Sequence, residues 1–199
     1  MSGRTDICSK VIHFTKAATY ADALDIILAI VGEGRLVAGT GMIRGGYRCV
    51  CFTEAPLPAI VSDLVDSEGS FTRYSPFGLM FEKSWIYEQG ARPVIYQPDA
   101  EFTELNEQMR WRHVRYEPAG TPPVDFTWER EWRLHRDDLV FSPGDAVLVV
   151  PNKEWESIVF GIWDYQQQLK VEAYSAILEQ TIVEQMHEPC PWRVVSLET

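Results

Sequence analysis

Apolar residues recur along this chain in short runs that turn residues separate. Runs rich in Val, Ile, Phe, Tyr, Trp and Thr are typical of strands, because these side chains pack well on a pleated sheet. Such runs lie at 11–15, 35–38, 47–53, 78–81, 93–96, 128–134, 146–150, 157–162 and 192–196. Strands are therefore predicted along the whole sequence, and no internal repeat is visible.

A second pattern, with apolar residues three and four positions apart, predicts helices. It is clearest at 20–31, where Thr19 is a suitable N-cap and Gly32 or Gly34 a suitable stop. Further helices are predicted at 59–65, 84–89, 101–115 and 165–186. Because the helices are grouped and do not alternate with every strand, we predict an α+β fold with a split or strongly curved sheet. No G-x-G-x-x-G follows a predicted strand and no P-loop occurs, so an ordinary dinucleotide-binding domain is not indicated.

Composition narrows the class of protein. The chain has 199 residues, of which 46% are hydrophobic, and these values fit one globular domain over residues 1–199. No segment is apolar enough to span a bilayer and the first residues lack a signal-peptide core, so we expect a cytoplasmic protein without membrane contact. The net charge of −11 argues against a broad electrostatic surface for nucleic acid. The sequence does not predict the oligomeric state.

The four cysteines do not indicate a metal site. Cys49 and Cys51 are too close for a usual zinc motif, and no His-rich segment lies nearby. On a strand the two would share one face, at a spacing that does not favour a disulfide. We therefore expect reduced thiols here and at Cys8 and Cys190.

Two predicted strands carry polar residues that are candidates for chemistry. His13 and Thr15 would share one strand face, opposite apolar neighbours. Such a histidine either binds a substrate hydroxyl or satisfies a main-chain carbonyl in the core, and the pattern taken alone favours the core. Thr53, at the end of its strand, either braces a neighbouring carboxylate or caps the turn that follows.

The segment 126–134, Phe-Thr-Trp-Glu-Arg-Glu-Trp-Arg-Leu, carries the most chemistry. Strand alternation would place Glu129, Glu131 and Arg133 on one face, with the two carboxylates about 7 Å apart. One alternative is an edge strand whose charges pair with a neighbouring strand. Another is a hydrolase or nuclease that holds a divalent metal at the two carboxylates, although no further acidic or His cluster at ligand spacing supports it.

Two further segments combine aromatic rings with polar groups. Residues 110–115, Arg-Trp-Arg-His-Val-Arg, either contact phosphates and bases or form a helix end whose arginines pair with nearby glutamates, and we favour the helix end. In the segment 74–78, Tyr74 and Phe77 either belong to the core or form a stacking wall for a planar ligand.

Taken in order, these motifs resemble the ADP-ribosyltransferase superfamily. Its minimal pattern is a His or Arg on an early strand, a Ser, Thr or aromatic residue on a second strand, and a late Glu. His13, Thr53 and Glu131 match that order, and 129–131 matches the Glu-x-Glu in which the late Glu often stands. The opening His-Phe-Thr and the Gly-Arg-Leu at 34–36 are also similar to the start of the DarT-like DNA-modifying toxins.

The layout most resembles the bacterial AbiGi-type abortive-infection antitoxin family. Its members share an opening His-Phe-Thr, and this chain also has the later motifs at 52–57, 74–81 and 126–133. The likeness spans residues 11–134 and leaves residues 135–199 without a motif. It implies an ADP-ribosyltransferase-like split, curved sheet and a role in toxin–antitoxin systems or phage defence.

The resemblance also implies an activity, the NAD⁺-dependent transfer of ADP-ribose to a protein, a nucleic acid or water. His13 would then bind a ribose hydroxyl, and main-chain groups near Phe14 and Thr15 would receive the nicotinamide amide. Thr53 would contact the nucleotide and brace the catalytic carboxylate.

The remaining implied roles fall on the late carboxylates and on the rings of 74–78. Glu131 would stabilise the positive charge that forms as nicotinamide leaves, and Glu129 would orient or deprotonate the acceptor. Tyr74 or Phe77 would stack on nicotinamide. The scheme needs Arg130 to point away, as strand alternation predicts. The alternative is a catalytically inactive relative that acts as a binding or antitoxin-like module.

Overall fold

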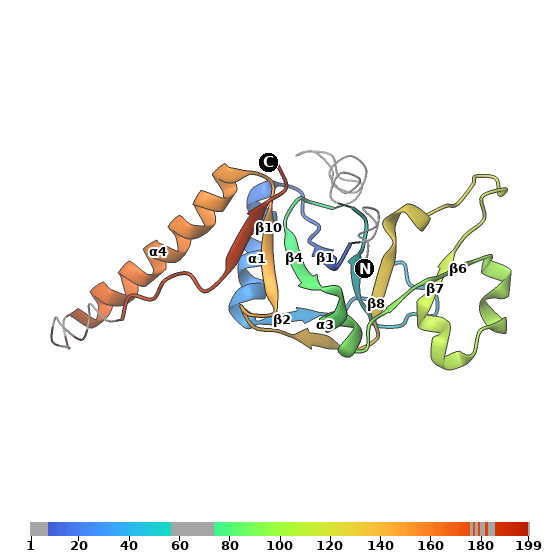
Figure 1. Ribbon diagram of the computed structural model, residues 1–199, viewed down its shortest axis with the longest axis horizontal. Coiled ribbons are helices and arrows are strands. Elements are labelled where there is room, and N and C mark those ends of the chain that lie inside the picture. The colour runs from blue at the N-terminus through green and yellow to red at the C-terminus, as the bar shows by residue number, and fades with distance from the viewer. Residues whose placement is uncertain are drawn as a thin grey trace.

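The chain folds around a seven-stranded mixed sheet in the order β11-β10-β4-β1-β3-β8-β5 (Figure 1). The computed structural model describes residues 8–56, 74–175, 177, 179, 182 and 186–198. Neighbouring strands are antiparallel except for β10 and β11, which are parallel and joined through a helix. The strands are β1 (Lys10–Phe14), β3 (Val50–Thr53), β4 (Gly78–Glu82), β5 (Arg92–Pro93), β8 (Glu131–Leu134), β10 (Ala146–Val150) and β11 (Arg193–Ser196).

Two small sheets flank this main one. Strand β2 (Arg35–Val37) pairs with β9 (Asp138–Val140), and β6 (Ile95–Gln97) pairs with β7 (His113–Arg115). The α-helices are α1 (Tyr20–Glu33), α3 (Lys83–Glu88) and α4 (Lys153–Ser175). The 3₁₀ helices are η2 (Asp99–Glu104), η3 (Glu107–Arg112) and η4 (Thr127–Glu129). The described part of the chain is therefore an α+β protein with a mixed sheet and flanking helices.

Helix α1 begins and ends where the sequence predicts. The Thr19 hydroxyl accepts a hydrogen bond from the Asp22 amide at 3.1 Å, which satisfies one of the unpaired amides of the first turn. Gly34 stops the helix with a φ of 61°, a left-handed conformation that glycine adopts without steric cost. Between these ends, Ala23, Leu24 and Ile27 are buried against the sheet.

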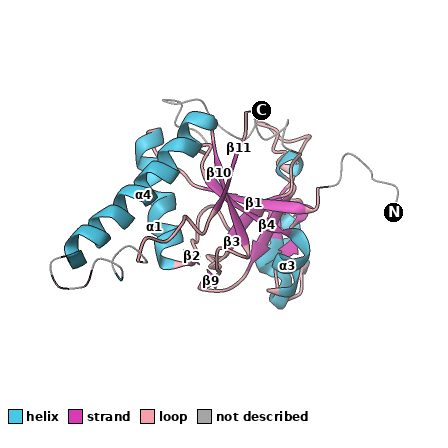
Figure 2. Ribbon diagram, turned by 60° about the vertical axis from the view of Figure 1, so that its left-hand side comes forward, coloured by secondary structure: helices cyan, strands magenta, loops and turns pink. Residues whose placement is uncertain are grey.

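The sheet has apolar clusters on both faces. The larger cluster contains Val11, Phe52 and Leu79 from the strands and lies under α1. Helices α1 and α4 lie on the same side of the strands (Figure 2), where the Tyr20 and Trp155 rings meet at 5.8 Å. The smaller cluster consists of Ile12, Phe14, Ala55 and Val149, with partly buried residues packed around it.

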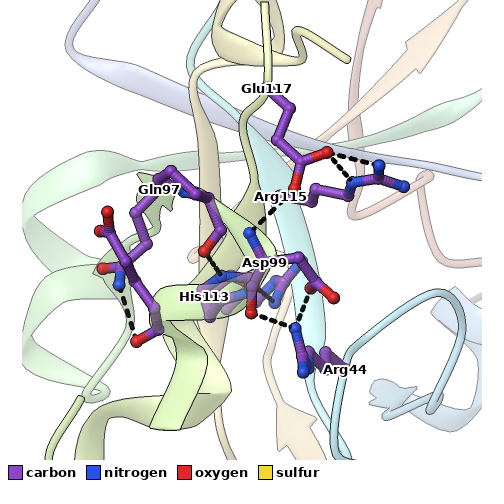
Figure 3. A network of polar contacts seen from close by, with 9 residues as sticks. Arg44, Gln97, Asp99, His113, Arg115 and Glu117 are labelled. Carbon is purple, nitrogen blue, oxygen red and sulfur yellow. Dashed lines mark hydrogen bonds and ion pairs between the residues drawn. The ribbon is translucent and has the colours of Figure 1, made fainter. Parts of the chain in front are cut away.

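Residues 94–126, which we call the arm, extend beyond the β5 edge of the sheet (Figure 1). Polar contacts hold the arm together (Figure 3): the Asp99 amide donates to the Glu117 carboxylate at 3.2 Å, and that carboxylate also pairs with Arg115. An ion pair between Asp99 and Arg44 connects the arm to the loop before β3. The arm is therefore an ordered part of the structure, attached at more than its two ends.

Several predicted elements are corrected by the structure. Residues 101–115 do not form one α-helix, because they are divided between η2, η3 and β7. Residues 157–162 are not a strand, since they belong to α4, and the predicted strand 128–134 begins only at Glu131. Strand β9 is not predicted at all. The helix expected at 59–65 lies outside the described residues.

Helix α4 places no more than part of its surface in the core. Val159 and Gln167 are its buried residues, and Tyr165 and Leu169 are among those it exposes. Even so, none of the helices in the described ranges has both the length and the hydrophobicity that crossing a bilayer requires.

Candidate active site

A cleft opens near the middle of the sheet, on the side of the smaller apolar cluster. It encloses about 370 Å³ of empty space, part of which is open to solvent. Its lining residues are Ile12, His13, Phe14, Cys51, Phe52, Thr53, Tyr74, Glu129 and Glu131. Four segments that are distant in sequence therefore meet at one concave surface.

Strand register explains how three of these segments meet. Ile12 on β1 pairs with Thr53 on β3, and Thr53 pairs with Glu131 on β8. Paired residues lie on the same face of a sheet, so these three side chains face the cleft together. Alternation alone would place His13 on the opposite face. Along their described lengths, β1 and β3 are paired in register only at Ile12 and Thr53. We attribute the ability of the His13 side chain to reach the cleft to this limited pairing.

His13 lines the cleft with a defined tautomer. Its Nδ1 lies 2.8 Å from the carbonyl oxygen of Cys51, and because a carbonyl can only accept, Nδ1 carries the proton. Burial lowers the pKa of His13 below its ordinary value of 6.5, although the hydrogen bond to Cys51 acts in the opposite direction. The neutral ring therefore leaves Nε2 without a proton, as an acceptor for a hydroxyl. The histidine therefore satisfies a main-chain carbonyl, as one sequence interpretation expects, and it also lines a cleft.

Thr53 braces the segment that carries Glu129. Its hydroxyl donates to the main-chain oxygen of Glu129 at 2.6 Å and accepts from the amide of Ala55 at 3.1 Å. The predicted brace on a carboxylate is therefore corrected: Thr53 holds main chain. The hydroxyl also serves the turn after β3, which is the other role considered from the sequence.

Glu129 and Glu131 reach the cleft from different kinds of structure. Glu131 is the first residue of β8, whereas Glu129 ends the 3₁₀ helix η4. Arg130 stands between them with a φ of 46°, in the left-handed region. Glu129 is therefore brought beside Glu131 by the tight turn through Arg130, and not by strand alternation. Arg130 itself is not among the residues that line the cleft.

Glu131 is held by three neighbours. Arg133 donates to both of its carboxylate oxygens, from Nε at 2.7 Å and from Nη2 at 3.1 Å. The Tyr96 hydroxyl accepts a hydrogen bond from its amide at 3.2 Å. Burial first, and then the charge and hydrogen bonding of Glu131, raise the pKa of Cys51 so that its thiol stays protonated. Glu131 is therefore an ionic partner of Arg133 that also borders an open cleft.

The residues from 14–15 and 74–78 divide between the cleft and the interior. Phe14 and Tyr74 line the cleft. Burial raises the pKa of Tyr74, and the charge of Glu129 adds to the effect, so its phenol stays neutral. Thr15 instead donates to the carbonyl of Phe77 at 2.9 Å, away from the lining residues. Phe77 is fully buried against Tyr20 and Trp155, so its ring is not placed to stack on a ligand.

Three contributors to this site are missed by sequence reasoning: Arg133, Cys51 and Tyr96. The shared strand face of Glu131 and Arg133 is a signal that could have identified the ion pair. Cys51 shares a face with Thr53, which is a weaker signal. Tyr96 lies on the arm, and no local pattern connects it with β8, because their contact depends on the tertiary fold.

The basic segment 110–115 lies beside the site, and two of its three arginines donate to main-chain carbonyls, whereas Arg115 pairs with Glu117. Arg110 donates to the carbonyls of Thr103 and Leu105, and Arg112 donates to that of Pro93. The expected helix end with arginine–glutamate pairs is therefore corrected for these two residues, because η3 is a single short 3₁₀ helix.

The residues in the ranges that the structure describes offer no suitable set of ligands for a metal ion. No group of three or more His, Cys, Asp or Glu side chains among those residues is arranged to hold a metal ion. All four cysteines are free thiols. The metal-dependent hydrolase interpretation therefore has no donor set within these ranges.

Comparison with known proteins returns no match to this chain from protein-family models, from curated proteins or from solved structures. The chemistry of the site must therefore be argued from its own residues.

Proposed function

We propose that this protein is an NAD⁺-dependent ADP-ribosyltransferase, with an α+β fold of the ADP-ribosyltransferase type. One observation carries the proposal: His13, Thr53, Tyr74, Glu129 and Glu131 line a single cleft. The sequence motifs single out these five residues together with Phe14, Thr15 and Phe77, and all of the eight except Thr15 and Phe77 line the cleft. Motif order that arose by chance would not be expected to bring six of eight residues to one surface.

The electrostatics of the cleft suit a reaction in which positive charge develops on a sugar. Two acidic side chains, Glu129 and Glu131, line it, whereas the imidazole of His13 and the phenol of Tyr74 are neutral. Fixed negative charge stabilises a developing cation most strongly when water is partly excluded. An unprotonated Nε2 of His13 is an acceptor for a ribose hydroxyl.

In the proposed reaction, the bond between the ribose anomeric carbon and the nicotinamide nitrogen breaks. Its electron pair leaves with nicotinamide, and Glu131 stabilises the positive charge left on the sugar. An acceptor atom then forms the new bond to that carbon, and Glu129 takes the proton that the acceptor loses. Of the two rings in segment 74–78, Tyr74 is the one available to contact the nicotinamide ring, because it lines the cleft and Phe77 is buried.

The cleft is partly open to solvent, so only part of NAD⁺ would lie within its lining residues and the remainder would extend beyond them. The acceptor would approach from the solvent-open side.

Nicotinamide release tests the proposal directly. The purified protein is incubated with NAD⁺, and nicotinamide is quantified by chromatography for the parent, for Glu131→Gln and for the control Glu82→Gln. Glu82 is half exposed and pairs with Lys10, outside the cleft. We expect Glu131→Gln to lose about 100-fold or more in turnover, as removal of one transition-state contact usually does, and the control to match the parent. Equal turnover in the parent and Glu131→Gln would refute the assigned role.

A second candidate function has one specific observation in its favour. Both oxygens of Glu131 are engaged by Arg133, which reduces the negative charge that faces the cleft. A relative that binds a nucleotide without turnover would tolerate such a pairing. NAD⁺ binding measured by calorimetry, with no nicotinamide released from NAD⁺ in the presence of any candidate acceptor, would favour this inactive binding or antitoxin-like module over the enzyme.

A further inference from the structure

The ion pair between Arg133 and Glu131 is largely buried, unlike an ordinary surface ion pair. The side chain of Arg133 is 6% exposed, and its partner Glu131 is 15% exposed. A buried guanidinium is costly to desolvate, and it is tolerated where its donors are satisfied in good geometry. This arginine meets that condition, because its fork fits the carboxylate of Glu131 with one donor on each oxygen.

The other side of the guanidinium is anchored to the arm. Nη1 donates to the main-chain oxygen of Trp111 at 3.0 Å and to that of His113 at 2.9 Å. These two carbonyls belong to the end of η3 and the start of β7. Four of the five N–H donors of Arg133 are thereby assigned, which leaves the side chain little rotational freedom.

The geometry of the pair leaves room for a ligand. Each carboxylate oxygen has two acceptor directions, and the arginine fork uses one on each oxygen. The Cys51 thiol uses a third direction, which leaves one for a hydroxyl donor on a carboxylate that lines the cleft. An unanchored glutamate side chain would sample several rotamers, and holding it in one reduces the entropy lost when a substrate binds.

We propose that Arg133 is a positioning residue for Glu131, which fixes the carboxylate toward the cleft by anchoring it to the main chain of the arm. This inference rests on the proposed function for its effect on turnover. It further implies that the arm belongs to the catalytic apparatus, because the carbonyls of residues 111 and 113 set where Arg133 stands.

Three variants test the proposal. Arg133→Gln removes the charge and the fork, Arg133→Lys keeps the charge and loses the fork, and Arg48→Lys is the matched control. Arg48 also donates to a main-chain carbonyl, that of Ala38, and pairs with the carboxylate of Asp137, but it lies outside the arm and outside the cleft lining. We expect Arg133→Gln to lower kcat for nicotinamide release about 100-fold with a small change in KM for NAD⁺, because misplacing a reacting group by about 1 Å has an effect of that size. Arg133→Lys should fall between Arg133→Gln and the parent, since lysine cannot form the fork, and Arg48→Lys should match the parent.

A second measurement does not depend on turnover. In nitrogen-15 spectra, the Nε–H of Arg133 should be slow to exchange in the parent and should shift and broaden in Glu131→Gln, as its acceptor weakens. If the parent releases no nicotinamide, the proposed function fails, and the spectrum still decides whether Arg133 holds Glu131. An Nε–H signal unchanged in Glu131→Gln would overturn the positioning role. Turnover in a folded Arg133→Gln equal to or above that of the parent would also overturn it, because the ion pair would then be neutral or inhibitory.

Discussion

Thr53 connects two segments of the site through one hydroxyl. It donates to the carbonyl of Glu129 and accepts from the amide of Ala55, so it fixes both the turn after β3 and the end of η4. We predict that Thr53→Val, which keeps the shape and removes the hydroxyl, lowers the free energy of unfolding by about 1–3 kcal/mol, since both partners lose a hydrogen bond in a buried setting. Urea denaturation measures this change. Thr53→Ser keeps the hydroxyl and is the control, and a Val variant as stable as the parent would show that water replaces both bonds.

His13 gives the protein a pH dependence with a defined sign. Burial lowers its pKa in the folded state below 6.5, so the unfolded chain binds a proton more readily. Stability from the neutral ring is therefore fully present above pH 6.5 and is lost as the pH falls through the lowered folded pKa. We predict that the stability advantage of the parent over His13→Gln shrinks between about pH 7.5 and about pH 5.5. Denaturant midpoints at both pH values test this, and a constant difference would contradict it.

At the scale of elements, the approach of β4 to β1 depends on Gly78. A Cβ at this position would lie 2.5 Å from the main-chain oxygen of His13, closer than real Cβ contacts allow, and 3.1 Å from the Phe14 ring, which is a tight contact. We predict that Gly78→Ala forces the strands apart, at a cost of about 1–3 kcal/mol in unfolding free energy, and lowers any turnover by displacing His13.

Gly32 provides the matched control for that experiment. Its Cβ would meet nothing within 4 Å, and it lies inside α1. Gly32→Ala should therefore be neutral or stabilise by up to about 1 kcal/mol, because alanine favours a helix over glycine. Thermal and urea unfolding of both variants separate a steric clash at residue 78 from a general effect of adding a methyl group.

Local patterns predicted the elements with strong local signals. Helix α1 has a hydroxyl cap and a glycine stop, and β10 has an uninterrupted apolar run, so neither needs tertiary information. Residues 157–162 show why such patterns fail: an apolar run of strand length is also compatible with a helix, and here α4 contains it. Residues 101–115 were predicted as one helix, but η2 and η3 are linked by an extended Leu105.

The candidate site, like the fold, was predictable from the sequence only in part. The motifs of the early strands and the late carboxylates were visible in sequence, and the structure brings His13, Thr53, Glu129 and Glu131 to one cleft. The anchoring of Glu131 was not visible, because the contacts of Arg133 with Trp111 and His113 depend on how the arm folds back. Of the two roles considered for Phe77, core packing and stacking on a ligand, the structure shows core packing, because the side chain is fully buried. The sequence therefore predicted which residues line the cleft better than it predicted which groups each side chain contacts.

For the whole molecule, the order of strands joins early and late parts of the chain. β1 lies between β4 and β3, and β10 from the later part of the chain pairs with β4. Neither half of the chain can complete this sheet alone. We predict one cooperative unfolding transition, with the same midpoint by far-ultraviolet circular dichroism and by tryptophan fluorescence. Two separated transitions would show that the protein contains independently folding units.

The same strand order has a consequence during synthesis. A ribosome releases β1 and β3, with His13 and Thr53, before it releases β8 with Glu131. Until β8 pairs with β3, the nascent polypeptide lacks the acidic side of the cleft. The cleft is therefore completed only late in translation, and a prematurely terminated product that ends before residue 131 carries His13 without Glu131.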